Sequence, residues 1–189
     1  MFMLCSSVIQ TWGSSPAERE ESYPCDGLVD RPVILFRAVD IDAPSRLVFL
    51  WLCQLRLAPY SYDWIDNGGR RSPRQLTEGL DQLEVGQRFM TMFRLVSFEE
   101  GRSITVDSLT TLFGRVACTY RVVSVDSFRS RLVVKLVLGS PQGLRGWVMS
   151  RILPAGDLIM MRKQLLTLKA LAERDASGSL PHLSIDAPR

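Results

Sequence analysis

Hydrophobic positions change their spacing along the chain, and each change predicts a new element. Residues 32–41 (PVILFRAVDI) form a short apolar run that is typical of a buried strand. Residues 42–57 (DAPSRLVFLWLCQLRL) then repeat apolar side chains at helical spacing. We expect Asp42 to cap this helix, and Pro44 suits its first turn. A second, short helix is expected over residues 60–67.

Between residues 87 and 138 the period becomes two, which predicts strands. In one segment the side chains that share a face are Leu112, Val116, Cys118, Tyr120 and Val122, and in another they are Leu132, Val134, Leu136 and Leu138. Apolar residues that alternate with polar ones indicate an antiparallel sheet with one face in water. A further short strand is expected in residues 145–151 (RGWVMSR).

Residues 153–176 carry the spacing of a long closing helix. Pro154 and Asp157 suit its first turns, and Lys169 and Glu173 form a supporting pair four residues apart. The helix is apolar on two sides, since a second ridge of Ile159, Leu166 and Ala170 lies apart from its broad apolar arc. We therefore expect a sheet to enclose it.

Gln164 falls inside the broad apolar arc of that helix. A buried amide without a partner costs roughly 1–3 kcal/mol, so Gln164 should have a hydrogen-bond partner. Two interpretations remain open. The amide is either a polar group on the wall of an apolar pocket or a simple structural bond to a strand-end carbonyl or a neighbouring side chain.

The order strand, two helices, several strands and a long helix predicts an α+β fold. Residues 1–30 show no periodicity and are expected to form an irregular N-terminal extension. Residues 31–176 would form the folded domain. Residues 177–189 are polar, contain two prolines and are expected to be a flexible tail.

Composition and charge narrow the function. The 189 residues are 46% hydrophobic and 23% charged, and the net charge is +3 with basic residues scattered along the chain. A nucleic-acid binder usually concentrates its basic residues on one face, so no nucleic-acid partner is expected. No run approaches the roughly 20 apolar residues of a membrane span, and the first ten residues make a poor signal peptide. We therefore expect a cytoplasmic protein.

Cysteine and histidine offer little catalytic chemistry. The four cysteines show no C-x-x-C spacing, so no metal site and no cofactor are expected. Cys53 and Cys118 lie among apolar residues and should be small core side chains. His182 is the single histidine and lies in the polar tail, which leaves Ser-His or Cys-His catalysis without a base.

Residues 58–74 (APYSYDWIDNGGRRSPR) gather aromatic and charged side chains around a glycine pair. Asp63 or Asp66 could act as a general base, with Tyr62 or Arg94 polarising a substrate oxygen. Two other interpretations stay open. Tyr62 and Trp64 could gate a ligand, or the segment could be a structural anchor.

Two stretches resemble a known family. The strand and helix of residues 37–55 (RAVDIDAPSRLVFLWLCQL) and the closing residues 156–173 (GDLIMMRKQLLTLKALAE) resemble the START-like or SRPBCC superfamily, which includes polyketide cyclase-like proteins. The resemblance covers residues 32–176, and residues 59–74 look like an uncharacterised bacterial subgroup. It implies a helix-grip fold: a curved antiparallel sheet wrapped around the long C-terminal helix, with two short helices after the first strand.

The same resemblance implies a deep apolar cavity between the helix and the sheet. Its candidate ligand-binding residues are Trp51, Tyr62, Trp64, Arg94, Tyr120, Met160 and Gln164. The first hypothesis is therefore the binding of a hydrophobic or aromatic small molecule. The alternatives are a polyketide cyclase or dehydratase-like enzyme, and a regulatory or protein-interaction module without turnover. A homodimer is the oligomer considered.

Overall fold

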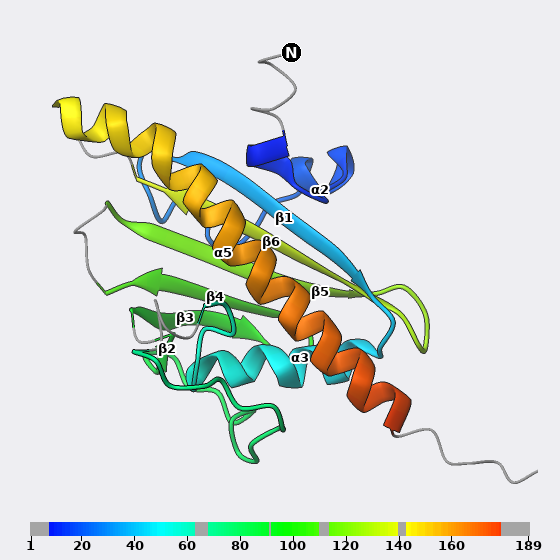
Figure 1. Ribbon diagram of the computed structural model, residues 1–189. Helices are drawn as coiled ribbons and strands as arrows, with labels where there is room; N and C mark the ends of the chain where they lie inside the picture. The colour runs from blue at the N-terminus through cyan, green and yellow to red at the C-terminus, as the bar shows by residue number, and fades with distance from the viewer. Residues whose placement is uncertain (1–7, 63–67, 91, 110–113, 140–142, 179–189) are drawn as a thin grey trace, which may run out of the picture.

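The computed structural model describes residues 8–62, 68–90, 92–109, 114–139 and 143–178. A curved sheet of six antiparallel strands, in the order β1-β6-β5-β4-β3-β2, is crossed on one face by the long helix α5 (Figure 1). The strands are β1 Val33–Ile41, β2 Arg88–Phe89, β3 Phe93–Glu99, β4 Ser103–Ser108, β5 Val116–Ser124 and β6 Ser130–Leu138. The helices are α2 Pro16–Glu20, α3 Ser45–Cys53, the 3-10 turn η1 Gln54–Arg56 and α5 Gly143–Gly178. The predicted α+β helix-grip architecture is confirmed.

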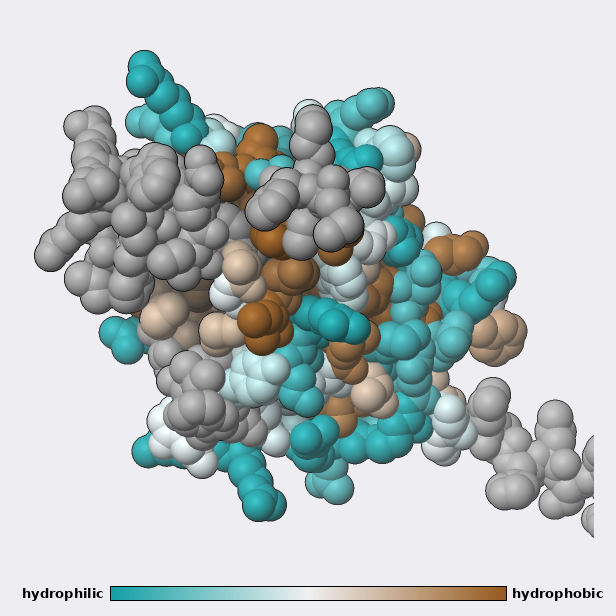
Figure 2. Space-filling model, turned by 45° about the horizontal axis from the view of Figure 1, so that its top comes forward, coloured by the Kyte–Doolittle hydropathy of each residue, from teal (hydrophilic) through white to brown (hydrophobic). Residues whose placement is uncertain are grey.

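The main core lies between the concave face of the sheet, α3 and α5. Alternate residues of each long strand point into it, as the period of two predicts, and Leu165, Leu168 and Leu171 of α5 meet them. Cys53 and Cys118 are buried there, which confirms their predicted place. The second apolar ridge of α5 differs from the prediction. Ile159 is 59% exposed, so the sheet encloses one side of this helix. Figure 2 shows hydrophobic side chains at the surface on this face of the molecule.

Helix α5 begins earlier than the sequence pattern indicates. It includes residues 145–151, so the predicted short strand there is wrong. Strand β6 is paired on both sides, with β1 and with β5. The residues that follow β6 therefore find no unpaired strand next to them with which to form a further strand. Helical hydrogen bonds satisfy the backbone locally instead. Asp157 consequently lies well inside α5 rather than in its first turn.

The connection after β1 also differs from expectation. The N-cap of α3 is Pro44, without a side-chain cap, and the predicted cap Asp42 instead donates its backbone N–H to Glu173 of α5 over 2.9 Å. Residues 58–62 are not helical, and Tyr60 has a φ of 56°, which an α-helix does not allow. The predicted helix over residues 60–67 is therefore wrong for its described part, and residues 63–67 lie outside the described chain.

The described part of the N-terminal extension, residues 8–30, is ordered and covers part of the outer face of the sheet. Helix α2 starts with a capping box formed by Ser15 and Glu18, and the residues that follow pack on β1, β5 and β6. Tyr23 and Cys25 are buried there against Phe36. The expectation of an irregular extension and a water-facing sheet surface thus missed this layer, because residues 1–30 have no periodicity to predict it.

Polar residues on the covered part of the outer face are satisfied by the same extension. The backbone N–H of Cys25 donates to the Thr119 hydroxyl over 3.1 Å. The Lys135 ammonium lies 2.6 Å from the Asp26 carboxylate. These polar side chains on β5 and β6 resemble a water-facing surface in the sequence, yet they are the attachment points of a second layer.

Candidate functional site

Two polar side chains stand among the apolar ones on the concave face of the sheet. Arg37 of β1 and Tyr120 of β5 each lie opposite Val134 of β6 in the strand register, so they share one row with Val134 between them. Their neighbours along β1, Leu35 and Val39, belong to the apolar core. Each of the two polar groups reaches a partner on α5.

Tyr120 and Gln164 form the first contact between sheet and helix. The Tyr120 hydroxyl donates to Oε1 of Gln164 over 2.8 Å, and Nε2 of Gln164 donates to the carbonyl of Pro59 over 2.6 Å. The sulfur atoms of Met90 and Met161 both lie 3.9 Å from the hydroxyl. The prediction that Gln164 has a hydrogen-bond partner is confirmed. Burial raises the pKa of Tyr120 well above its ordinary value, so the hydroxyl stays protonated and able to donate.

Arg37 and Asp157 form the second contact, which the sequence analysis missed. Nη2 of Arg37 lies 2.8 Å from Oδ2 of Asp157, and Nη1 donates to the carbonyl of Phe36 over 2.8 Å. The Arg37 side chain is fully buried and that of Asp157 is 17% exposed. Burial raises the pKa of Asp157 to about 6, although the nearby Arg37 acts in the opposite direction.

A sequence signal for Arg37 did exist. The residue shares the apolar face of residues 32–41 with Leu35 and Val39, where the period of two places side chains in the core. A charge at such a position is seldom fully buried unless it is paired. The position of Arg37 on this face therefore predicts a buried partner, but it does not identify Asp157 as that partner.

The inner-facing side chains of the sheet are less buried towards the end where β6 finishes. Three inner-facing side chains of the last row, Val33, Phe93 and Val116, are only partly buried, whereas Leu138, which lies between Val33 and Val116, is buried. In the next row inward the corresponding side chains are all buried, and they are Leu35, Leu136, Cys118, Val106 and Leu95. Asp157 and Met160 of α5 are likewise partly buried. Apolar surface is therefore left accessible on the sheet side at this end.

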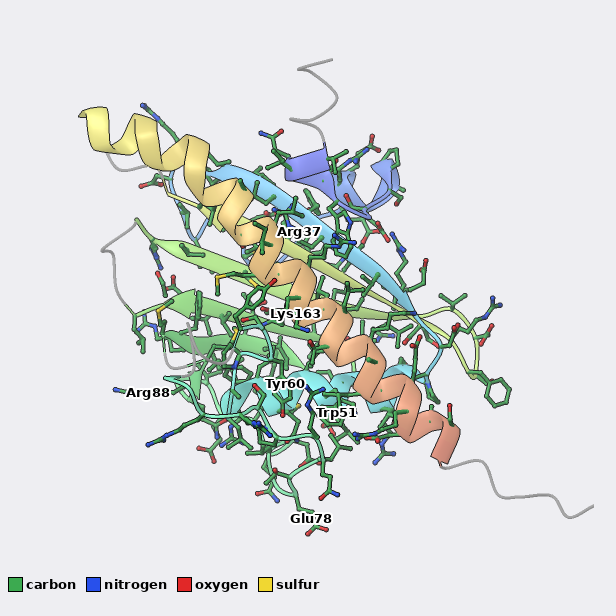
Figure 3. The ribbon with its side chains drawn as sticks, in the orientation of Figure 1. Arg37, Trp51, Tyr60, Glu78, Arg88 and Lys163 are labelled. Atoms are coloured by element: carbon green, nitrogen blue, oxygen red, sulfur yellow. The ribbon has the colours of Figure 1, made fainter. Side chains whose placement is uncertain are left out.

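Trp51 lies away from the Arg37–Asp157 pair, but its contact Tyr60 directly follows Pro59, the acceptor of Gln164. Trp51 is fully buried, its indole N–H donates to Asp175 over 3.1 Å, and its ring meets Tyr60 edge-on at 6.0 Å. Figure 3 shows Trp51 and Tyr60 together beside α3, whereas Arg37 lies under the other half of α5. Asp175 follows Asp157 by 18 residues along α5, which corresponds to about 27 Å.

Arg94 lies on the opposite side of the sheet from Tyr120. Its neighbours Phe93 and Leu95 face the core, while its own side chain is 52% exposed and lies 3.6 Å from Asp107. Asp107 is buried and also accepts two hydrogen bonds from Arg115, of 3.1 and 2.9 Å. The structure therefore does not bring Arg94 together with Tyr120 and Gln164. The α5 methionine whose sulfur lies beside the Tyr120 hydroxyl is Met161, the neighbour of the predicted Met160.

The remaining predicted residues fall near or beyond the described part of the chain. Tyr62 is partly buried at the end of the segment that follows Pro59. Asp63, Trp64 and Asp66 lie outside the described residues.

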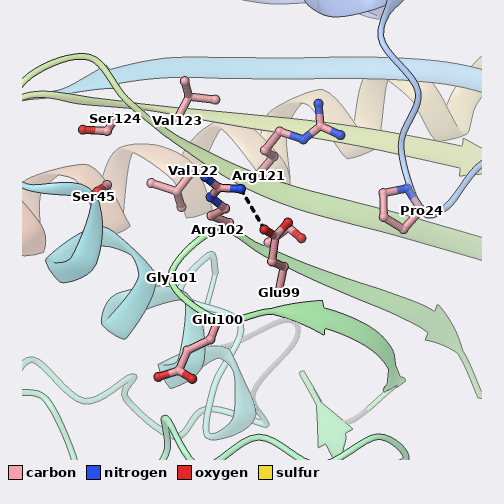
Figure 4. Close-up of a pocket in the computed structure, with 11 residues that line it drawn as sticks. Pro24, Ser45, Glu99, Glu100, Gly101, Arg102, Arg121, Val122, Val123 and Ser124 are labelled. Atoms are coloured by element: carbon pink, nitrogen blue, oxygen red, sulfur yellow. Dashed lines mark hydrogen bonds and ion pairs between the residues drawn. The ribbon is translucent and has the colours of Figure 1, made fainter.

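A surface pocket of about 720 Å³ lies elsewhere in the molecule (Figure 4). Residues 99–103 of the β3–β4 turn and residues 121–124 of β5 form most of its wall, and none of its described lining residues comes from α5. Both arginines in this wall are paired within the protein. Arg102 lies 2.9 Å from Glu99, and Arg121 binds Glu21. The pocket is therefore separate from the space between sheet and helix.

Other chemistry is limited in the described part of the chain. Within it, no group of three or more His, Cys, Asp or Glu side chains is placed to hold a metal ion. None of its helices is long and apolar enough to cross a membrane. Cys25, Cys53 and Cys118 are free and buried, and burial raises the pKa of Cys53 to about 12. These thiols are neutral near pH 7 and hence poor nucleophiles.

Solved structures share this architecture. The Zhui aromatase/cyclase from Streptomyces sp. R1128 matches with a TM-score of 0.54 and 19% identity, over 78% of this chain and 98% of its own. The chain has the helix-grip fold. A hypothetical protein from Helicobacter pylori matches this helix-grip chain with a TM-score of 0.50 and 12% identity, over 80% and 95% of the two chains.

A START superfamily protein from Mycobacterium smegmatis is also similar to the helix-grip chain. Its TM-score is 0.49 and its identity 12%, and the match covers 75% of this chain and 97% of that one. No protein-family model matches the sequence. No curated protein matches it either.

Proposed function

We propose that this helix-grip protein binds a hydrophobic or aromatic small molecule between α5 and the concave face of the sheet. The observation that carries the proposal is the Tyr120–Gln164 pair, a polar contact set among apolar side chains and two methionine sulfurs. Ligand sites of this kind are mostly apolar, with a few polar groups that fix the orientation of the ligand. Methionine supports the proposal because its flexible side chain adapts to different ligand shapes.

The partly buried row at the end of the sheet supports an approach to this site. Val33, Phe93 and Val116 leave apolar surface accessible beside the N-terminal half of α5. An apolar ligand that covered these side chains would gain roughly 25 cal/mol for each Å² removed from water.

Displacement of an apolar fluorescent dye tests this proposal. We expect Nile red to bind the protein with one saturable site and a blue-shifted emission. The Tyr120→Phe variant should weaken an oxygen-bearing aromatic competitor such as 2-naphthol but not its hydrocarbon counterpart naphthalene. The matched control is Phe128→Ala, since Phe128 is 69% exposed on the β5–β6 turn. Absence of saturable dye binding, together with no copurified small molecule in native mass spectrometry, would contradict the proposal.

An enzyme of the cyclase or dehydratase type is the second candidate. The specific observation in its favour is Asp157, a carboxyl group whose pKa is raised to about 6 at the accessible end of the concave face. A group with such a pKa can accept and return a proton near neutral pH. The match to an aromatase/cyclase supports this candidate through the fold alone.

The two candidates separate in a turnover assay. Conversion of poly-β-ketone analogues to aromatic products by the wild-type protein, lost in Asp157→Asn, would favour the enzyme. The sequence candidates Asp66→Asn and Tyr62→Phe belong in the same series. Binding without conversion by any variant would favour the binding protein.

A further inference from the structure

We propose that the ligand of this site carries an acidic oxygen group, such as a carboxylate, that binds the Arg37 guanidinium in place of Asp157. The inference rests on the proposed binding function and adds the chemical class of the ligand. Its basis is the geometry of one buried ion pair that joins β1 to α5 across the concave face.

Arg37 is a permanently charged group in an apolar surrounding. Its side chain is fully buried, and its row neighbour Val134 and strand neighbours Leu35 and Val39 are apolar. A buried guanidinium needs an anion close by, because removal from water is costly for an unpaired charge. Any group that takes the place of Asp157 must therefore also be an anion.

Asp157 is the more exchangeable partner of the pair. Its side chain is 17% exposed, whereas that of Arg37 is not exposed at all, so solvent reaches the carboxylate side first. Asp157 also lies on the half of α5 beside the partly buried row of Val33 and Val116. A ligand that covers this row would bring its polar end towards the Arg37–Asp157 contact.

The exchange couples ligand binding to one proton. Two carboxylates beside a single arginine in an apolar site would repel each other, so Asp157 must bind a proton when the ligand anion takes Arg37. The proton comes from solvent, and no covalent bond changes. Since the pKa of Asp157 is already raised to about 6, this protonation is an accessible step near neutral pH.

The other titratable groups that face this pair stay neutral. Within the described residues they are Cys118 and Tyr120 of β5, which interact electrostatically with Asp157. Burial raises the pKa of both groups well above their ordinary values. The proton taken up on binding is therefore assigned to Asp157.

Isothermal titration with two matched compounds tests the inference. The probes are 2-naphthoate and its neutral isostere 2-naphthamide, titrated from pH 5.5 to 8 in buffers of different ionisation enthalpy. We expect 2-naphthoate to bind more tightly than the amide at pH 5.5, to lose about tenfold in affinity per pH unit above pH 6, and to take up one proton at pH 7.5. The amide should show neither effect.

Two variants separate the roles of the pair. Asp157→Asn should bind 2-naphthoate about tenfold or more tightly than the wild type at pH 7.5 and lose the pH dependence, since no proton is then required. Arg37→Gln should no longer bind 2-naphthoate more tightly than 2-naphthamide, and it should still bind the amide. Asp107→Asn is the matched control, because it removes a buried carboxylate paired with arginine on the opposite face.

The results distinguish a failure of the proposed function from a failure of this inference. If both probes and Nile red fail to bind, the proposed function fails. If the dye and the amide bind but the acid shows no preference and no proton uptake, the proposed function stands and this inference is overturned. Should Arg37→Gln fail to fold, the probe pair and Asp157→Asn still decide the matter. Tighter binding of 2-naphthoate by the control variant Asp107→Asn would also overturn this inference.

Discussion

The side chains of Tyr120 and Gln164 join β5 to α5 through a hydrogen bond of 2.8 Å. Because the Gln164 amide also donates to the carbonyl of Pro59, one side chain connects the sheet, the long helix and the segment that leaves η1. All of these polar atoms lie in an apolar layer, where an unsatisfied group is costly. The pair therefore has a structural role in addition to the proposed role in ligand orientation.

A double-mutant cycle measures that structural role. Gln164→Leu leaves the buried Tyr120 hydroxyl and the Pro59 carbonyl without this partner, and we expect a loss of about 1–3 kcal/mol in the free energy of unfolding. Tyr120→Phe in the Gln164→Leu background should cost less than in the wild type, because the hydroxyl then has no amide to bind. Urea unfolding of the four proteins gives the coupling energy. Strictly additive losses would show that the bond contributes nothing.

The pH dependence of stability follows from Asp157. Its pKa is raised from 3.8 to about 6 in the folded protein, so the folded state holds the proton more tightly than the unfolded chain. The stabilisation from this group is fully present below pH 3.8 and is lost as the pH rises through 6. The wild type should thus lose stability relative to Asp157→Asn over this range.

Urea midpoints at pH 4, 5, 6 and 7 for the two proteins provide the measurement. Subtracting the variant from the wild type removes the titration of the other carboxyl groups, including Glu18, whose pKa shifts in the opposite direction. A difference that grows with pH instead of falling would mean that the ion pair with Arg37 outweighs the burial of the carboxyl.

The extension on the outer face makes its own contribution to stability. Tyr23 is buried, meets Phe36 edge-on at 5.8 Å and lies 4.0 Å below the Arg121 guanidinium. Tyr23→Ala should cost about 3 kcal/mol in unfolding free energy, in the range for buried aromatic residues. Phe128→Ala, at an exposed turn, is the matched control and should change stability little. Equal effects of the two variants would show that the extension does not stabilise the sheet.

Periodicity predicted the elements that have a clear apolar face. Residues 32–41 alternate or run apolar, and β1 spans Val33–Ile41 as expected. The long helix was likewise visible from its arc, and the predicted pair of Lys169 and Glu173 is present at 2.6 Å. Such patterns are local, so one sequence is enough to find them.

Contacts between distant segments were harder to predict. The partner of Arg37 lies 120 residues away on α5, and the cover of Thr119 lies 94 residues away in the extension. Nothing in the local spacing of either residue identifies the other. For Gln164 the need for a partner was predictable, but Tyr120 and Pro59 became its partners only through the fold. The residue type shows that a buried polar side chain needs a partner. The fold determines which residue becomes that partner.

The role of Trp51, as a core residue or as a ligand contact, can be tested directly. The resemblance to helix-grip proteins implied that Trp51 lines the cavity, whereas its indole bonds Asp175 in the half of α5 remote from Asp157. We predict that Trp51→Phe lowers the free energy of unfolding by about 1–3 kcal/mol, through lost packing and a lost hydrogen bond. Nile red affinity should stay at the wild-type value, because the ring lies far from the partly buried row at the other end of the sheet. Urea unfolding and dye titration of the same preparation measure both quantities. A weakened dye complex in a variant that remains fully folded would place Trp51 at the ligand after all.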